Sequence, residues 1–259
     1  MKKFNYFVLW PLSFRTLTPT LSLFLLFLFL GCVPDPLPDN TFYGPPQHFG
    51  DGVVKSIVVM KDEGVPEMIG LKISAKVLEN LPEEDYNVHF KLPGETEGLA
   101  IDHIDLGWNP HGHEPPGVYD IPHFDIHFYM ITEEYQSNIL DADKAEILPA
   151  NEFWPQDYFP TEGYVPQMGK HWLNMHADEI QEGGKFTRTF IYGSYDGEFQ
   201  FYEPMITLDY LKQKGSEQMA IPQPAEFQKT EFYYPTTYSI KYNPLKREYL
   251  ITMENMLLR

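Results

Sequence analysis

One short stretch of the chain holds most of its residues with metal-binding or acid–base chemistry. The sequence HGHEPPGVYDIPHFDIH, residues 111–127, contains four histidines and three carboxylates: His111, His113, His123, His127, Glu114, Asp120 and Asp125. Five of the nine histidines in the chain lie between His103 and His127. Neutral imidazoles and carboxylates together are the protein ligands of zinc, iron, manganese, copper and nickel. The stretch therefore predicts a site for a divalent transition metal.

The second half of this stretch is expected to be a β-strand. Aromatic and β-branched residues, which favour strands, dominate HFDIHFYMI, residues 123–131. Because side chains alternate across a strand, His123, Asp125 and His127 would share one face and the apolar residues between them the other. Asp125 could then orient the two imidazoles, as carboxylates do around metal ligands.

Other segments are expected to complete the site. Pro115 and Pro116 stiffen the loop that carries His111, His113 and Glu114, which could bring this loop back over the strand. His171 in PQMGKHWLNMH and Glu203 in FYEPMI could join from farther along the chain. The predicted metal ligands are His111, His113, His123, His127, His171 and Glu114; Asp125, Tyr129 and Glu203 are expected to support them, and Glu114 and Asp125 are the candidate catalytic groups.

Two other interpretations of the histidine cluster stay open. The histidines and Asp125 could form a buried structural network with Tyr119 and Tyr129, without any metal. They could also do acid–base chemistry without a metal, since histidine titrates near neutral pH. A metal with three protein ligands and one open position would be catalytic, whereas four ligands would make it structural. The sequence shows no serine-nucleophile motif, phosphate-binding loop or dinucleotide fingerprint.

The N-terminus has the pattern of an export signal. Lys2, Lys3 and Arg15 precede a ten-residue apolar run, Leu21 to Leu30, and no acidic residue occurs before Asp35. The run has the length of a signal-peptide core and is too short to span a bilayer by itself. A membrane anchor extended back through FNYFVLWPLSF is the alternative.

Cys32, the only cysteine of the chain, directly follows this run and Gly31. The arrangement resembles a bacterial lipobox, which implies cleavage before Cys32 and acylation of the new N-terminus. We therefore predict a signal peptide at residues 1–31, a lipid-anchored tether at 32–49 and a single β-rich domain at 50–259. The expected location is the bacterial cell envelope, at the outer membrane or its periplasmic face, and the membrane is a partner through lipidated Cys32.

The charge of the chain argues against nucleic-acid binding. It has 19 lysines and arginines against 37 aspartates and glutamates, a formal net charge of −18. Binding to nucleic acid depends on cations placed against phosphates, which this composition does not favour. A protein partner or a homo-oligomer stays possible.

The fold is expected to be mainly β, a sandwich or barrel with a few short helices and some α+β character. Hairpins are predicted for residues 53–61 with 67–73, for 185–192 with 198–203, and for 230–242 with 247–255. Short helices are predicted from Thr132, from Thr207 to Lys214 and from Asn174 to Gln181, and another from Ser74 to Leu81. Twenty-three prolines predict long, fixed loops.

Residues 107–131, GWNPHGHEPPGVYDIPHFDIHFYMI, resemble the characteristic block of a family of uncharacterised, mostly exported bacterial proteins. Residues 165–172 and 189–207 resemble later blocks of that family. The resemblance implies that His111, His113, Glu114, His123, Asp125, His127, His171 and Glu203 belong to one region. The spacing of His111, His113 and His171 is also similar to that in cupins, small metal-binding β-barrels, although cupins place the glutamate several residues farther on.

Overall fold

The computed structural model describes Met1 and residues 37–61, 64–94, 96 and 98–259. The predicted signal peptide and Cys32 lie outside these ranges. From residue 37 onward the described chain belongs to one compact unit. Within the described ranges, no helix combines the length and the apolar composition that crossing a membrane requires.

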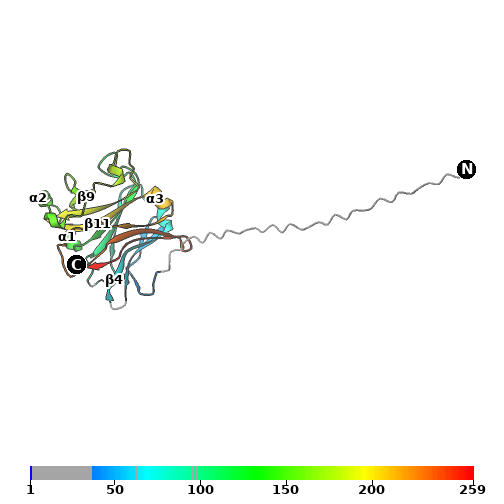
Figure 1. The fold of residues 1–259 in the computed structure, drawn as a ribbon, viewed down its shortest axis with the longest axis horizontal. Helices are drawn as coiled ribbons and strands as arrows, with labels where there is room; N and C mark the ends of the chain where they lie inside the picture. The colour runs from blue at the N-terminus through cyan, green and yellow to red at the C-terminus, as the bar shows by residue number, and fades with distance from the viewer. Residues whose placement is uncertain (2–36, 62–63, 95, 97) are drawn as a thin grey trace. The chain divides into compact units, whose positions relative to one another are not determined.

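The fold is mainly β, as predicted, and consists of two antiparallel sheets of seven strands each packed as a sandwich. Figure 1 shows strands of the two layers, β4 and β11, on opposite sides of the folded unit. The first sheet contains β1 (Thr41–Tyr43), β2 (Gln47–Phe49), β3 (Gly52–Met60), β4 (Pro66–Ser74), β15 (Glu248–Glu254), β14 (Thr237–Asn243) and β12 (Ser216–Ala220). Strands β1 and β2 both pair with β3, so residues 41–49, assigned to the tether from the sequence, contribute to the sheet.

The second sheet carries the candidate site. Its order is β5 (Tyr86–Lys91), β6 (His103–Asn109), β7 (His123–Tyr129), β11 (Glu198–Thr207), β10 (Arg188–Tyr195), β9 (Lys170–Asn174) and β8 (Tyr158–Pro160). The histidine-rich strand β7 is therefore an interior strand, paired with β6 on one side and β11 on the other. A separate two-stranded ribbon joins β13 (Tyr233–Tyr234) and β16 (Leu257–Leu258).

The predicted hairpins are confirmed as β3–β4, β10–β11 and β14–β15. Helices are few and short: α1 (Glu133–Ser137), α2 (Ala142–Ala145) and α3 (Leu208–Lys212), with 3-10 turns η2 (Ala75–Leu78), η3 (Asn151–Phe153) and η4 (Asp178–Ile180). Thr132 and Thr207 cap α1 and α3, as expected from the sequence. The helix predicted from Asn174 is wrong, because Asn174 pairs with Tyr158 at the end of β9 and only η4 forms beyond it.

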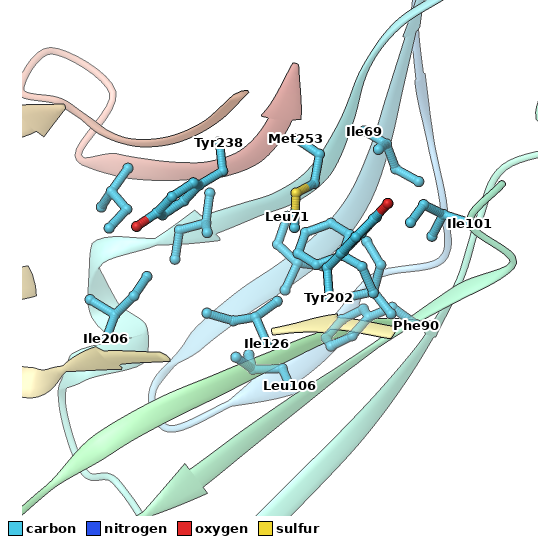
Figure 2. Close-up of a cluster of buried hydrophobic side chains, with 14 of the residues drawn as sticks. Ile69, Leu71, Phe90, Ile101, Leu106, Ile126, Tyr202, Ile206, Tyr238 and Met253 are labelled. Carbon is cyan, nitrogen blue, oxygen red and sulfur yellow. The ribbon is translucent and has the colours of Figure 1, made fainter. Parts of the chain in front are cut away.

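The main core fills the space between the two sheets. Figure 2 shows Ile69, Leu71 and Met253 of the first sheet facing Leu106 and Ile126 of the second. The apolar residues of β7, at positions 124, 126 and 128, all point into this core. Burial of many such aliphatic and aromatic side chains is the main stabilising contribution to a domain of this size.

The opposite face of the second sheet is also covered. Two small apolar clusters lie there, one around Tyr129 and Phe201 and the other around Tyr119 and Met205. They include residues from the connections between β6 and β7 and between β7 and β9. Polar side chains of β7 on this face are therefore removed from water, although they do not belong to the main core.

Candidate metal centre

Strand β7 places its polar residues on the covered outer face of the second sheet. His123 is 0% exposed, Asp125 7% and His127 3%. The predicted strand and its alternation are confirmed, but the residues on its polar face are buried like those on its apolar face. A buried polar group without a partner is costly, so the partners of these three side chains decide what the site can do.

His127 forms a first group with His171 and Glu203. Their ligand atoms all lie within 4.8 Å of one another. Oε1 of Glu203 is 3.3 Å from Nε2 of His127, and Oε2 is 3.5 Å from Nε2 of His171. Two ligands at about 2.1 Å from a tetrahedral metal are separated by about 3.4 Å, which matches both distances.

Three different strands bring this group together. Strand β11 pairs with β7 through Tyr202 opposite Phe128, which places Glu203 in the row beside His127. Strand β10 then links β11 to β9, because Gly193 pairs with both Phe201 and His171. A side chain at Gly193 would collide with the Phe201 ring, since a Cβ there would lie 2.0 Å from it. This glycine lets the ring lie against the imidazoles of His127 and His171.

In the absence of a metal, burial favours the neutral form of all three side chains in the first group. Burial lowers the pKa of His127, and burial together with the neighbouring His127 lowers the pKa of His171 to about 3. Both imidazoles are therefore neutral near pH 7, with lone pairs available. Burial, reinforced by the charge of Asp125, raises the pKa of Glu203 well above its usual value.

Two atoms of this group are buried without any hydrogen-bond partner: Nε2 of His127 and Oε2 of Glu203. Such orphaned atoms are rare in folded proteins and call for an explanation. A divalent cation between the three side chains would satisfy both atoms and restore the ionised form of Glu203. Two histidines and one carboxylate are a donor set used for zinc and for non-haem iron. The residues present thus fit a metal.

His113, His123 and Asp125 form a second group of the same composition. Asp125 Oδ1 is 3.2 Å from Nε2 of His123, and Oδ2 is 3.3 Å from Nε2 of His113. Nδ1 of His113 lies 2.8 Å from the carbonyl oxygen of Glu114, and Nδ1 of His123 lies 2.6 Å from that of Ile121. If each Nδ1 donates to its carbonyl, both Nε2 atoms are left with lone pairs that face Asp125, as in many metal sites.

The second group differs from the first in its electrostatics. Burial lowers the pKa of His113, but the hydrogen bond and charge of Asp125 outweigh it and raise that pKa. Burial also opposes ionisation of Asp125, yet contacts with His113 and His123 hold the pKa of Asp125 well below its usual value. Asn109 donates a hydrogen bond of 2.7 Å to Oδ2 of Asp125. Without a metal, this group can therefore be an ion pair.

A third group, His89, His103 and Asp105, lies on the same face of the sheet. Its ring nitrogens and carboxylate are mostly hydrogen-bonded: His89 Nδ1 lies 2.8 Å from Asp105, and Gln136 links Asp105 to His103. Nε2 of His89 has no hydrogen bond of good geometry, although it lies 3.0 Å from Oε1 of Glu133. This group is a hydrogen-bonded network linked by Gln136, and it differs in its residues from the network with Asp125, Tyr119 and Tyr129 that the sequence left open.

A cavity of about 710 Å³ adjoins the first two groups. His113 and His171 both contribute to its wall, so each group places one imidazole on the cavity and keeps its other two ligands behind it. The side chains of His113 and His171 are 40% and 17% exposed, compared with 2% for Glu203. An ion in either group would therefore have one imidazole ligand in the wall of the cavity.

The structure distributes the sequence-predicted residues unevenly. His113, His123, His127 and His171 lie at ligand positions, whereas His111 is exposed and belongs to none of these groups. Glu114, predicted as a ligand, is in none of these groups; it is one of the residues that line the cavity, and its backbone carbonyl oxygen contacts His113. Asp125 and Glu203, expected to support the ligands, are themselves at ligand positions. Tyr129 stacks between His103 and His127.

Sequence reasoning did not anticipate the roles of Asn109, Asp105 and Gln136. The signal for Glu203 was visible, because its carboxylate lies within the otherwise apolar residues 201–206 of the strand. Comparisons with protein-family models, curated proteins and solved structures found no match. The case for the site therefore rests on its geometry.

Proposed function

We propose that the protein binds a divalent transition metal through His127, His171 and Glu203, in an envelope protein held to the membrane by lipidated Cys32. One observation carries the metal proposal. The ligand atoms of three side chains lie within 4.8 Å of one another, and two atoms of these side chains are buried without a hydrogen-bond partner. Zinc, iron, manganese and copper all accept this donor set, which leaves open which of them is bound.

The surroundings of this centre favour catalysis over storage. Within the described residues the first group has three ligands, so a coordination position would stay open toward the cavity that His171 lines. A bound divalent metal would supply Lewis-acid activation of a water or carbonyl group in that cavity. Phe201 and Tyr129 pack against His127 and keep bulk water from the other side of the group.

The second group supports a related proposal. His113, His123 and Asp125 hold a second ion in the same way, with His113 as the ligand next to the cavity. Because a protonated His113 can pair with Asp125 when no metal is bound, this site is expected to bind metal more weakly than the first. A closed hydrogen-bonded network without metal is the alternative function, and it fits the third group better than these two.

The decisive experiment measures metal in a purified chain that begins at residue 33, without added metal, by elemental mass spectrometry. We expect at least one equivalent of a transition metal per chain, and a Glu203→Gln variant should contain one equivalent less. A His176→Asn variant is the matched control, because His176 is 70% exposed and outside all three groups. Absence of metal in the unaltered chain, even after reconstitution with zinc, iron, manganese and copper, would refute the proposal.

The membrane proposal has its own test. Full-length chain produced in a bacterium should fractionate with membranes and carry acyl chains on residue 32. Cys32→Ser should release the protein into the soluble fraction while its metal content stays unchanged. Membrane association that survives this substitution would support the alternative of an N-terminal anchor.

A further inference from the structure

The cavity beside the two metal groups has a composition that restricts what can enter it. It is lined by residues of the His113 loop, by residues 159–165 and by His171. At about 710 Å³ it lies within the usual range of small-molecule sites, roughly 300–1,000 Å³. A single water or inorganic ion would leave most of this space unfilled.

Aromatic side chains and prolines form much of the wall. Tyr119, Phe159 and Tyr164 contribute rings, and Pro115, Pro116 and Pro160 contribute rigid apolar surface. Both tyrosine hydroxyls are engaged away from the cavity: Tyr119 donates to Glu179, and Tyr164 donates to the backbone carbonyl of Leu140. These two residues are therefore left to contact a ligand mainly through their rings, which suits an apolar or aromatic body.

The wall contains acidic but no strongly basic side chains. Among the described residues that line the cavity, two are glutamates, Glu114 and Glu162, and none is a lysine or arginine. Lys170 lies nearby but is buried, pairs with Glu146 and donates to the carbonyls of Thr161 and Gly163. Its ammonium group thus holds the wall loop in place and is unavailable to an anion in the cavity.

We propose that this cavity binds a small organic molecule with an aromatic or apolar body, neutral or cationic, that reaches the metal through a single oxygen-donor group. The inference rests on the proposed metal function, since the metal receives the donor group. Glu114 and Glu162 disfavour molecules whose body carries an additional anionic group away from the metal, because no lysine or arginine among the lining residues offsets that repulsion.

Three hydroxamic acids test the proposal on the zinc-loaded chain, with binding measured by isothermal titration calorimetry. Acetohydroxamic acid supplies the donor group alone, benzohydroxamic acid adds an aromatic body, and 4-carboxybenzohydroxamic acid adds an anion to that body. We expect benzohydroxamic acid to bind about tenfold more tightly than acetohydroxamic acid, since its ring is buried. The carboxylated compound should bind about fivefold more weakly than benzohydroxamic acid at low salt.

Variants test whether residues of the cavity wall cause these differences in affinity. Tyr164→Ala should lower the affinity for benzohydroxamic acid by about fivefold and leave that for acetohydroxamic acid unchanged. Tyr43→Ala is the matched control, because Tyr43 is an exposed tyrosine on β1 of the other sheet. The double variant Glu114→Gln with Glu162→Gln should remove the penalty on the carboxylated compound. Zinc content is measured on every sample.

The outcomes separate the two proposals. If the chain binds no zinc, the proposed function fails and this inference fails with it. If zinc and acetohydroxamic acid both bind but the aromatic ring adds no affinity, only the inference on ligand class is overturned. Equal or tighter binding of the carboxylated compound to the unaltered chain would overturn it as well.

Discussion

Two histidine groups on the same face of one sheet have nearly the same composition but opposite states. In the group of His89, His103 and Asp105, Gln136 and Asp102 bond both nitrogens of His103, and Gln136 and His89 bond the carboxylate of Asp105, which leaves Nε2 of His89 as the one ring nitrogen without a hydrogen bond. In the group of His127, His171 and Glu203, two buried atoms have no partner. Residue types alone therefore do not define a metal site. What distinguishes the two is whether neighbouring side chains already satisfy the donor atoms.

The sharpest test of this comparison is the response of stability to metal. A metal at about a thousand times its dissociation constant stabilises the folded state by about 4 kcal/mol. For a domain of this size, that corresponds to a rise in melting temperature of about 10 °C. We expect this rise in the unaltered chain and its loss in Glu203→Gln, measured by differential scanning calorimetry.

The control for that measurement comes from the other group. Asp105→Asn should keep the full metal-induced rise, because Asp105 belongs to the hydrogen-bonded network. A rise that disappears in Asp105→Asn but persists in Glu203→Gln would reverse the assignment of the two groups.

A second prediction concerns the cost of removing a carboxylate when no metal is present. Asp105→Ala leaves a nitrogen of His89 and one of Gln136 without their acceptor, which should cost about 3 kcal/mol of unfolding free energy. Glu203→Gln should cost less than about 1 kcal/mol, since burial already favours the neutral form of that carboxyl. Urea denaturation of both variants in the presence of a chelator measures the contrast. If both variants lose the same unfolding free energy, the carboxyl groups of Asp105 and Glu203 contribute equally to stability without a metal, which contradicts the distinction between the two groups.

The smallest effect expected is a pH dependence of the metal-free chain. The pKa of His171 is about 3 in the folded state, below the usual 6.5 of the unfolded state. As pH falls below 6.5 the unfolded chain takes up a proton that folded His171 does not, so stability decreases with falling pH. Between pH 6.5 and pH 5 this amounts to about 2 kcal/mol.

The comparison of the unaltered chain with His171→Asn isolates this contribution. The stability difference between them, measured by denaturant unfolding at the two pH values, should shift by about 2 kcal/mol against the unaltered chain at the lower pH. If the stability difference does not shift, His171 takes up a proton in the folded state over this pH range, and its lone pair is then not free to bind a metal.

Much of the architecture could be predicted from local patterns. Alternation in HFDIHFYMI predicted both the strand β7 and the shared face of His123, Asp125 and His127, because side-chain direction in a strand has a period of two residues. Turn residues between apolar runs predicted three hairpins correctly. The helix expected from Asn174 was wrong because pairing with β8, a contact between distant segments, outweighed local propensity.

The sequence by itself determined that the chain carries a dense set of imidazoles and carboxylates and that β7 presents three of them in a row. Only the tertiary structure decided how they divide. His123 and His127 lie on one strand but belong to different groups. Asp125 contacts both His123 and His113. Strands β11 and β9 place Glu203 and His171 beside His127. The physical reason is register: pairing between strands far apart in the chain fixes which donor atoms meet, and local sequence does not encode that pairing.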